Sequence, residues 1–545
     1  MDDRYLIEFA KCRADPIYFM ETYCRVAHPT KGLVPFKLYD FQKRVVKDFL
    51  NNRFVIVNKS RQVGLSTVTS NYALWLALFF KNRTIKIISI KDNDAKDFLK
   101  KIKTSYSGLP EWLRDEPVVS NVHTLELTSG SVIESVASGS SAARGTSPSL
   151  LIIDEFAFIP RIEEIWTSAY PALAQGGSAI LISTPNGIAS LFYQLWSKAD
   201  PTLPEEERNN FHRIFVHWTE VPEYRGFELE EGMSREEIIR RAREQQWYRM
   251  MRPQFTDRRW AQEFEGDFLG SGNTVIKGEQ LKLLVHRTRE PDLRYSLRQR
   301  GENDYELVVD DEGPLWVWEK PREDGLYLVS ADVASGVAED YSAFYVFDLA
   351  TGRPVAEFKG KLNTIRYAHL LARVGQWYNS AMIVPEVTGL GFGTLQKLIY
   401  EIGYTNIFRR VDPQKPKQNK KDLWGWQTTS KTKPFLINAI IEYFDDVDKV
   451  EYISQRLWEE LAAFVWKTSD DAAAEQGHND DLVMAFAIGL YAMKLYKMRS
   501  PLPEVMLLNS PETKATKLPP AILSTRVDDV TEEIREWLYG AWQDK

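Results

Sequence analysis

Residues 55–67 have the composition of a phosphate-binding loop. They read Val-Ile-Val-Asn-Lys-Ser-Arg-Gln-Val-Gly-Leu-Ser-Thr, so an apolar run enters a short polar loop and a hydroxyl pair opens a helix. Backbone N–H groups at a helix N-terminus hold phosphate oxygens, and a hydroxyl reaches Mg²⁺. The pattern G-x-x-x-x-G-K-[ST] is not met, because Lys59 replaces its first glycine and Leu65 its lysine. We predict that the Lys59 ammonium reaches the β- and γ-phosphate oxygens from the other end of the loop.

The predicted nucleotide contacts in this loop are Lys59, Ser60, Arg61, Gln62, Val63, Gly64, Leu65, Ser66 and Thr67. Ser66 is also a predicted Mg²⁺ ligand. A second apolar run, 149–153, ends in Asp154 and Glu155. In nucleotide hydrolases the first such acid holds Mg²⁺ and the second orients the attacking water. Taken alone, this run is equally compatible with a buried strand that ends in solvated acids. Loop and acids together favour hydrolysis of ATP or GTP.

Composition sets the broad class. A chain of 545 residues with 44% apolar residues and sixteen Trp is long enough for two or three globular domains. The net charge of −7 by itself indicates no nucleic-acid partner, although charge can be concentrated locally. Cys12 and Cys24 are too few for a disulfide framework, and we expect buried free thiols in a reducing compartment. We expect no signal peptide. The sequence contains no run of eighteen apolar residues, so it predicts no membrane span.

The first 265 residues alternate strand-like and helix-like segments. This alternation predicts a mostly parallel sheet covered by helices on both faces, with ligands at the carboxyl ends of the strands. The predicted strands are Phe54–Asn58, Ile85–Ile90, Val132–Ala137, Leu150–Asp154 and Ala179–Ser183. We therefore expect an α/β ATPase domain of the P-loop (ASCE) type over residues 1–265.

A glycine-rich segment, 270–274, predicts a hinge within residues 266–280. A second α/β domain is expected over 281–497. Its predicted elements are strands Leu326–Asp332, Ser342–Asp348, Arg353–Gly360 and Ala381–Glu386 and a helix over 480–497. Residues 498–545 are expected to form a linker and a short amphipathic helix, Arg526–Trp542.

Carboxylates recur at the ends of the elements of this second domain. They are Asp332, Asp340, Glu386, Asp480 and Asp481. Hard carboxylate oxygens bind Mg²⁺ or Mn²⁺, and two such ions can cleave a phosphodiester. The order of strands and acids matches a ribonuclease H-like nuclease with all five acids as metal ligands. Singly, each acid could instead be a solvated strand end or, for Asp480, a helix N-cap.

Between Glu386 and Asp480 lies a basic segment, 409–433. It carries eight basic residues against Asp412 and Asp422, and Trp424 and Trp426 are interleaved with them. A basic loop with aromatic side chains beside an acidic metal site is suited to grip a phosphate backbone. A solvated surface loop is the alternative.

Taken together, these motifs over residues 36–497 resemble the large terminase subunit of tailed bacteriophages. The loop 60–67 resembles the family's variant phosphate loop, and Phe41-Gln42 resembles the motif that reads adenine, which favours ATP. Ser183-Thr-Pro-Asn186 resembles the coupling motif, in which Thr184 would sense the γ-phosphate; a plain strand-ending turn is the alternative. Residues 262–268 and 271–273 resemble the junction between motor and nuclease, and 425–433 and 478–482 resemble nuclease motifs.

The resemblance implies an arginine finger at Arg144, with Glu155 catalytic in the ATPase and Asp332, Glu386 and Asp481 catalytic in the nuclease. Which of Asp480 and Asp481 is the principal ligand stays open. It further implies ATP and Mg²⁺ as cofactors, with Mn²⁺ supporting the nuclease.

By the same resemblance, the partners are double-stranded DNA, a portal protein and a small terminase subunit. Five chains would assemble on the portal, an isolated chain could be monomeric, and no membrane is involved. The expected location is the host cytoplasm, then the procapsid transiently, and not the mature virion. Two alternatives stay open: a helicase-like ATPase whose C-terminal acids are structural, and a transposase-type nuclease with a regulatory ATPase.

Overall fold

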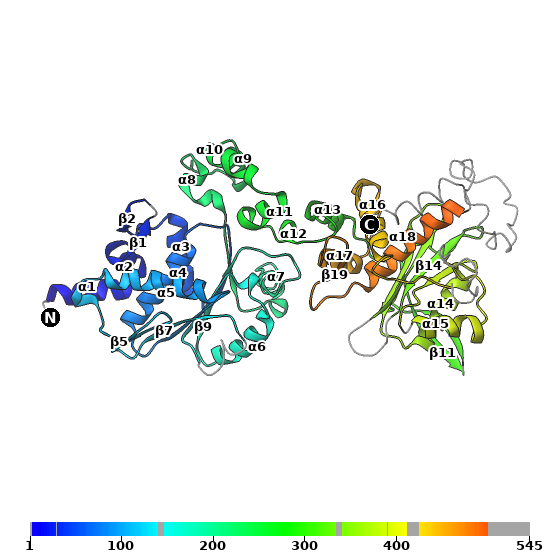
Figure 1. Cartoon of the computed structure of the whole chain (residues 1–545), viewed down its shortest axis with the longest axis horizontal. Coiled ribbons are helices and arrows are strands. Elements are labelled where there is room, and N and C mark those ends of the chain that lie inside the picture. Colours follow the sequence, from blue (N-terminus) through cyan, green and yellow to red (C-terminus); the bar gives the residue numbers. More distant parts are fainter. Residues whose placement is uncertain are drawn as a thin grey trace. The chain divides into compact units, whose positions relative to one another are not determined.

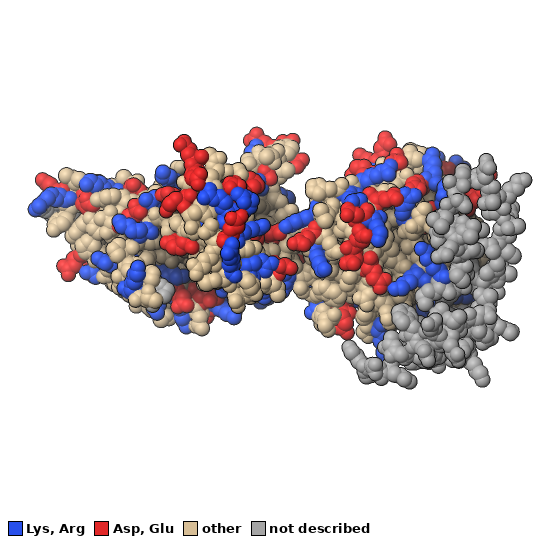
Figure 2. Space-filling view, turned by 90° about the horizontal axis from the view of Figure 1, so that it is seen from above, with Lys and Arg blue, Asp and Glu red and all other residues tan. Residues whose placement is uncertain are grey.

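The computed structural model describes residues 3–28, 30–139, 147–301, 303–333, 341–389, 391–410 and 424–499. It divides into two compact units, Met1–Asn273 and Thr274–Lys545, and the break falls within the predicted hinge. Arg144, Asp340, most of the basic segment (411–423) and the predicted C-terminal helix lie outside the described residues. Figure 2 shows basic and acidic side chains interspersed over one face of both units. No described helix is long and apolar enough to cross a membrane.

The N-terminal unit contains an eight-stranded sheet in the order β10-β3-β9-β8-β4-β7-β6-β5. Its strands are β3 (Phe54–Lys59), β4 (Thr84–Ser89), β5 (Pro117–Ser120), β6 (Thr124–Leu127), β7 (Val132–Ala137), β8 (Leu150–Asp154), β9 (Ser178–Ser183) and β10 (His212–Val216). The pairings from β10 to β7 are parallel, and β5 and β6 are antiparallel at one edge. One strand, β9, separates β3 from β8, as in P-loop ATPases of the ASCE type.

Helices cover both faces of this sheet (Figure 1). They are α1 (Asp3–Ala14), α2 (Pro16–Tyr23), α3 (Asp40–Asn51), α4 (Leu65–Phe79), α5 (Asp92–Ser107), α6 (Ile162–Leu173) and α7 (Leu191–Ser197). Along β3, Val55 and Val57 enter the core under α3, α4 and α5, whereas Phe54 and Ile56 enter the core under α6 and α7. This alternation follows from the period of two along a strand. Because β3 ends at Lys59, the loop that follows lies at the carboxyl edge of the parallel strands.

Shorter elements complete the unit. A hairpin pairs β1 (Arg25–His28) with β2 (Gly32–Pro35). After β10 come α8 (Pro222–Arg225), α9 (Arg235–Arg243), α10 (Gln246–Met251), α11 (Asp257–Trp260), the π-helical turn η6 (Ala261–Glu265) and α12 (Phe268–Ser271). Trp218, Trp247, Trp260 and Phe264 form a small aromatic core among these helices. As predicted, Cys12 and Cys24 are buried free thiols.

The C-terminal unit contains a seven-stranded sheet in the order β12-β11-β13-β16-β15-β14-β17. Its strands are β11 (Leu293–Gly301), β12 (Asp304–Val309), β13 (Leu315–Val317), β14 (Tyr327–Asp332), β15 (Ser342–Asp348), β16 (Pro354–Gly360) and β17 (Met382–Pro385). Strands β14 to β16 are antiparallel, and β17 is parallel to β14. This is the ribonuclease H-like order that the sequence predicts.

The helices of this unit are α13 (Gly278–Leu284), α14 (Thr364–Trp377), α15 (Gly391–Gln396), α16 (Lys433–Phe444), α17 (Gln455–Ala463) and α18 (Asp481–Arg499), and a small hairpin joins β18 (Phe464–Trp466) to β19 (Ala472–Ala474). On one face of the sheet, the Ser330 hydroxyl donates to the Ala485 carbonyl of α18 at 2.7 Å. On the other face, Tyr367 of α14 donates to the Ala343 carbonyl at 2.7 Å. The sheet therefore lies between α14 and α18.

Candidate functional sites

The loop between β3 and α4 has a concave backbone. Gln62 (φ 59°) and Gly64 (φ 79°) adopt left-handed conformations, and alternating handedness of this kind turns successive N–H groups toward one point. Gly64 precedes α4 without a side-chain cap, so the first-turn N–H groups of Leu65 and Ser66 have no intrahelical acceptor. The side chains of Val63 and Leu65 are buried in the core. These two residues can therefore reach a phosphate only through their backbones.

The Gln42 side chain contacts both this loop and the start of α3. Its Nε2 donates to the Val63 carbonyl at 3.0 Å, and its Oε1 accepts from the Tyr39 N–H at 3.1 Å. The side chain is 3% exposed. In this conformation the amide braces the phosphate loop and caps α3, so contact with adenine stays a prediction.

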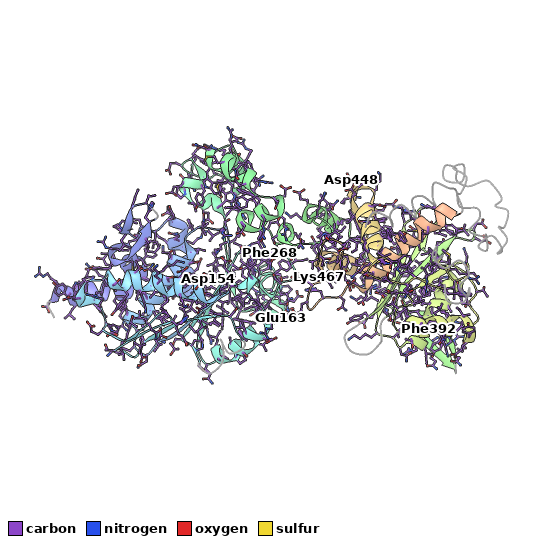
Figure 3. All side chains as sticks on the ribbon, viewed as in Figure 1. Asp154, Glu163, Phe268, Phe392, Asp448 and Lys467 are labelled. Atoms are coloured by element: carbon purple, nitrogen blue, oxygen red, sulfur yellow. The ribbon has the colours of Figure 1, made fainter. Side chains whose placement is uncertain are left out.

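Lys59 and Ser66 each contact one of the two acids at the end of β8. The Lys59 ammonium lies 2.8 Å from Glu155 Oε1, and the Ser66 hydroxyl donates to Asp154 Oδ2 at 3.1 Å. Asp154 Oδ1 is buried and has no hydrogen-bond partner among the described residues. A buried carboxylate oxygen beside a hydroxyl fits a hard cation such as Mg²⁺. Figure 3 labels Asp154 in the N-terminal unit.

Asp154 and Glu155 have different surroundings. Burial raises the pKa of Asp154, and the Lys59 ammonium opposes that rise. Glu155 follows in a left-handed conformation (φ 53°), which is rare for a residue with a side chain. Its Oε2 accepts from the Thr184 N–H at 3.5 Å. Thr184, at the end of β9, and the phosphate loop thus contact the same carboxylate.

The segment around η6 contacts the phosphate loop, which no sequence pattern predicts. The Arg61 N–H donates to the Glu263 carbonyl of η6 at 2.6 Å, and the Ser60 N–H donates to the Val216 carbonyl at the end of the neighbouring strand β10 at 2.8 Å. The Arg61 guanidinium also pairs with the Glu263 carboxylate at 3.2 Å. Those two N–H groups are therefore already occupied, and the N–H groups of Leu65 and Ser66, which are nearer the helix, remain for a phosphate.

The same segment reaches the predicted coupling motif. Gln262 Nε2 donates to the Pro185 carbonyl at 3.1 Å and to Asn186 Oδ1 at 3.3 Å. Arg259 donates to Gln262 Oε1 at 2.8 Å. The motif at 262–268 is visible in the sequence, but its contacts join residues about 77 and 200 positions apart and leave no periodic signal.

Four of the five predicted acids of the C-terminal unit are described, and they influence one another. Asp332 ends β14, and the Glu386 N–H donates to the adjacent Ala331 carbonyl at 2.8 Å. Burial raises the pKa of Asp332 well above its usual range, and the charges of Glu386, Asp481 and Asp480 raise it further. A buried carboxyl among like charges is the environment that a divalent cation stabilises.

The described acids do not form a preassembled metal cage. Within the described ranges, no three His, Cys, Asp or Glu side chains converge closely enough to hold an ion. Asp480 is buried, which raises its pKa, and its Oδ2 accepts from the Ala474 N–H at 3.1 Å. Its side chain is thus turned toward β19. Asp481 begins α18 and raises the pKa of Asp332 more strongly than Asp480 does.

The described ends of the basic segment lie beside Glu386. Trp426 forms a parallel β-bridge with Glu386, and the Val387 N–H donates to the Trp426 carbonyl at 2.8 Å. Arg409 stacks on Trp424 with 4.5 Å between guanidinium carbon and ring centre. Trp426 therefore lies next to Glu386, and the contact of the basic segment with DNA stays a prediction.

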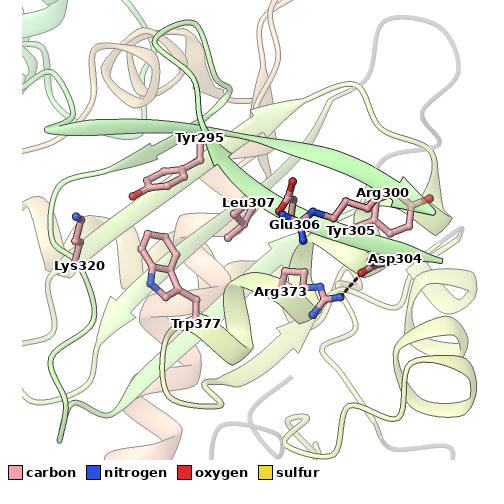
Figure 4. A pocket seen from close by; sticks show the side chains of 9 residues that line it. All are labelled: Tyr295, Arg300, Asp304, Tyr305, Glu306, Leu307, Lys320, Arg373 and Trp377. Atoms are coloured by element: carbon pink, nitrogen blue, oxygen red, sulfur yellow. Dashed lines mark hydrogen bonds and ion pairs between the residues drawn. The ribbon is translucent and has the colours of Figure 1, made fainter. Parts of the chain in front are cut away.

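A groove of about 550 Å³ lies elsewhere in this unit, between the β11–β12 hairpin and α14 (Figure 4). Tyr295 and Trp377 face each other in it, with 5.1 Å between ring centres, and Arg373 pairs with Asp304 at 3.1 Å. None of the predicted site residues lines the groove. The groove is therefore separate from the predicted site at the ends of β14 and β17.

Comparison with known proteins identifies a matching family model and curated relatives. Residues 56–283 match the family model described as "Terminase large subunit, T4likevirus-type, N-terminal". The large terminase subunits of Thermus virus P23-45 and Thermus phage G20c are each 27% identical over 280 residues, which are 48% of this chain and 48% of each relative. The chain thus spans about half the length of the curated relatives it matches.

Solved structures give weaker likenesses. The large terminase of bacteriophage HK97 aligns with 88% of this chain and 99% of its own, at 13% identity and a TM-score of 0.44. The large terminase nuclease of phage G20c with bound magnesium aligns with 40% of this chain and 96% of its own, at 20% identity and a TM-score of 0.28. The family match and the curated relatives show that this chain is similar to terminase large subunits over residues 56–283 and over about half of its length, respectively.

Proposed function

We propose that this chain is the ATPase and nuclease of a viral DNA-packaging motor. The observation that carries the proposal is the presence of two chemically different acid sites on one chain. One combines a phosphate loop with Asp154 and Glu155 in a unit that matches a terminase large-subunit family model. The other is a cluster of carboxylates on a ribonuclease H-like sheet. The first site would supply the ATP hydrolysis that moves DNA, and the second would supply the metal-dependent cleavage that cuts it.

In the proposed ATPase, ATP binds with its phosphates over the loop 62–66. Lys59 exchanges Glu155 for the β- and γ-phosphate oxygens, which carry more charge than one carboxylate. Glu155, once released, accepts the proton of the attacking water. Ser66 and Asp154 would hold Mg²⁺, which neutralises charge on the phosphates. The Thr184 N–H contacts Glu155, so a movement of the Glu155 side chain would be transmitted to the 183–186 motif, of which Thr184 is a part.

In the proposed nuclease, Asp332, Glu386 and Asp481 would hold divalent cations, with Asp340 and Asp480 contributing. Mg²⁺ or Mn²⁺ there supplies Lewis-acid stabilisation of the attacking and leaving oxygens. The raised pKa of Asp332 supports the choice, because its ionised form needs a compensating cation. The basic segment 409–433 would bind the DNA backbone.

The proposed assembly is a ring of five chains on a portal protein, with a small terminase subunit and double-stranded DNA as further partners. Arg144 would complete the ATP site of a neighbouring chain. The isolated chain could remain a monomer. The motor would act in the host cytoplasm, on the procapsid, and would leave before the virion matures.

DNA uptake tests this function. Procapsids with portal are mixed with the chain, ATP and linear DNA, and nuclease-protected DNA is measured. We expect protection that requires both portal and ATP, and plasmid nicking by the chain alone with Mn²⁺. ATP-dependent strand separation without uptake would support the helicase-like alternative. Nicking without ATP-driven uptake would support the transposase-type one.

A further inference from the structure

The first turn of α18, which begins at Asp481, is capped by a carboxylate from another helix. Glu460 lies on α17, and its Oε2 accepts from the N–H groups of Leu482 at 2.8 Å and Val483 at 3.1 Å. These N–H groups have no acceptor within their own helix. A side chain at the start of the helix normally accepts them. Here a residue 22 positions earlier in the chain does so.

This arrangement removes the capping role from Asp480. The Asp480 side chain accepts from the Ala474 N–H instead, while its main-chain carbonyl accepts from Met484 at 2.8 Å. The sequence offered N-cap and metal ligand as alternatives for Asp480. Because Glu460 occupies the capping position, neither Asp480 nor Asp481 has to serve as the cap.

The other oxygen of Glu460 connects α18 to the sheet. Glu460 Oε1 lies 2.5 Å from the Lys359 ammonium. Lys359 pairs with Ala343 on β15, and Ala343 pairs with Asp332 on β14. Residues opposite one another point to the same face, and strands are about 4.8 Å apart, so Lys359 lies in one row with Asp332 across a small alanine. Figure 1 shows α17 and α18 in the same unit as β14.

We propose that Glu460 is a positioning residue of the nuclease site, which fixes the start of α18, and with it Asp480 and Asp481, relative to Asp332. The inference rests on the proposed nuclease function. Glu460 is 5% exposed, so its contacts are shielded from water. Lys359 balances its charge, so it orients the acids without adding a further net negative charge to their cluster.

The test uses the full chain and compares Glu460→Gln, Lys359→Met and a control. Glu460→Gln keeps the shape and one acceptor but removes the charge. Lys359→Met breaks the pair and leaves the cap. The control is Glu442→Gln. Glu442 lies on α16, and its carboxylate pairs at the surface with Lys494 of α18. Burial raises the pKa of Glu460 to about 7, so the assays run at pH 8, where its carboxylate is ionised.

Two readouts are measured for each variant: Mn²⁺ binding by electron paramagnetic resonance, and plasmid nicking as a function of Mn²⁺. Supporting residues of metal sites typically change affinity 10- to 100-fold. We expect Glu460→Gln to raise the half-saturating Mn²⁺ concentration about tenfold in both readouts, and Lys359→Met to raise it less. Nicking at saturating Mn²⁺ should return to within a few-fold of wild type, and ATPase should not change. Glu442→Gln should behave as wild type.

The outcomes separate this inference from the function on which it rests. If the wild-type chain binds Mn²⁺ but does not nick DNA, the nuclease function fails. If the wild-type chain nicks DNA and Glu460→Gln has wild-type Mn²⁺ affinity, the positioning role is overturned. If Glu460→Gln does not fold, as judged by circular dichroism, Lys359→Met decides. A wild-type Mn²⁺ affinity in that variant overturns the proposal, and a weakened one supports it.

Discussion

The two acid sites of this chain balance their charges in different ways. In the N-terminal unit, Glu155 pairs with the buried Lys59 ammonium and Asp154 accepts from Ser66. In the C-terminal unit, the pKa of Asp332 is raised by burial and by three other acids, and the nearby Lys359 is committed to Glu460. The proposed ATP site is therefore largely assembled by the protein itself. The proposed nuclease site depends on the cation that it would bind.

This difference is tested most strongly by removing acids from the nuclease cluster. Asp332→Ala, Glu386→Ala and Asp481→Ala should each reduce DNA cleavage about 10³-fold, because each loses several kcal/mol of transition-state stabilisation by metal. ATPase should be unchanged, and thermal stability should not fall, because a buried like charge is removed. Plasmid nicking with Mn²⁺ and ATPase are measured on the same preparations. A parallel loss of both activities would contradict the separation of the two sites.

The second prediction concerns the way in which the phosphate loop is built. The sequence alone suggests that Leu65→Lys is tolerated, because many P-loops have lysine there. The structure places Leu65 in the core at 1% exposure. An unpaired ammonium there should reduce the free energy of unfolding of this unit by about 3 kcal/mol. Urea unfolding measures it, with Leu50→Lys, at an exposed site on α3, as the control. Equal stability of the two variants would contradict this packing.

Sequence patterns could predict the features that depend on neighbouring residues. Local patterns predicted β7 (Val132–Ala137), β8 (Leu150–Asp154) and β15 (Ser342–Asp348) to the residue, since buried strands are short apolar runs with polar ends. They also predicted that Asp154 ends β8 and that Asp332 ends β14.

Contacts between distant segments were missed. The Lys59–Glu155 pair spans 96 positions and the Glu263–Arg61 pair about 200, and neither has a spacing that a pattern can detect. Strand β10 (His212–Val216), the neighbour of β3, was also missed, because its alternating burial is weak at five residues. In the same way, Asp480 had the residue type of an N-cap, whereas the cap came from Glu460 through tertiary structure.

A smaller effect is expected from the ATPase base. Glu155→Gln should leave ATP binding intact and slow hydrolysis about 10²-fold, because the amide cannot accept the proton of the attacking water. Turnover and nucleotide affinity are measured separately, by phosphate release and by fluorescent-nucleotide titration. Glu163→Gln, at an exposed site on α6 of the same unit, is the control. Hydrolysis within a few-fold of wild type would remove Glu155 from its role.

The smallest effect should distinguish backbone strain from side-chain contact in the phosphate loop. Gly64 and Gly32 both have left-handed backbones, with φ of 79° and 70°. A Cβ at Gly64 would lie 2.8 Å from Gln42 Nε2, whereas nothing lies within 4 Å at Gly32. Gly32→Ala should therefore cost about 1 kcal/mol of stability from strain alone. Gly64→Ala should cost about 1 kcal/mol more and also weaken ATP binding, because Gln42 must release Val63.

A double-mutant cycle isolates that contact. In a Gln42→Ala background the added methyl group meets no amide, so the further cost of Gly64→Ala should fall to that of Gly32→Ala. Urea unfolding and nucleotide titration of the four variants measure the coupling, which is expected for residues in direct contact. Additive costs would mean that Gln42 does not brace the loop. The ATP site would then be less completely preassembled by the protein, and its contrast with the nuclease site would rest on Lys59 and Ser66 alone.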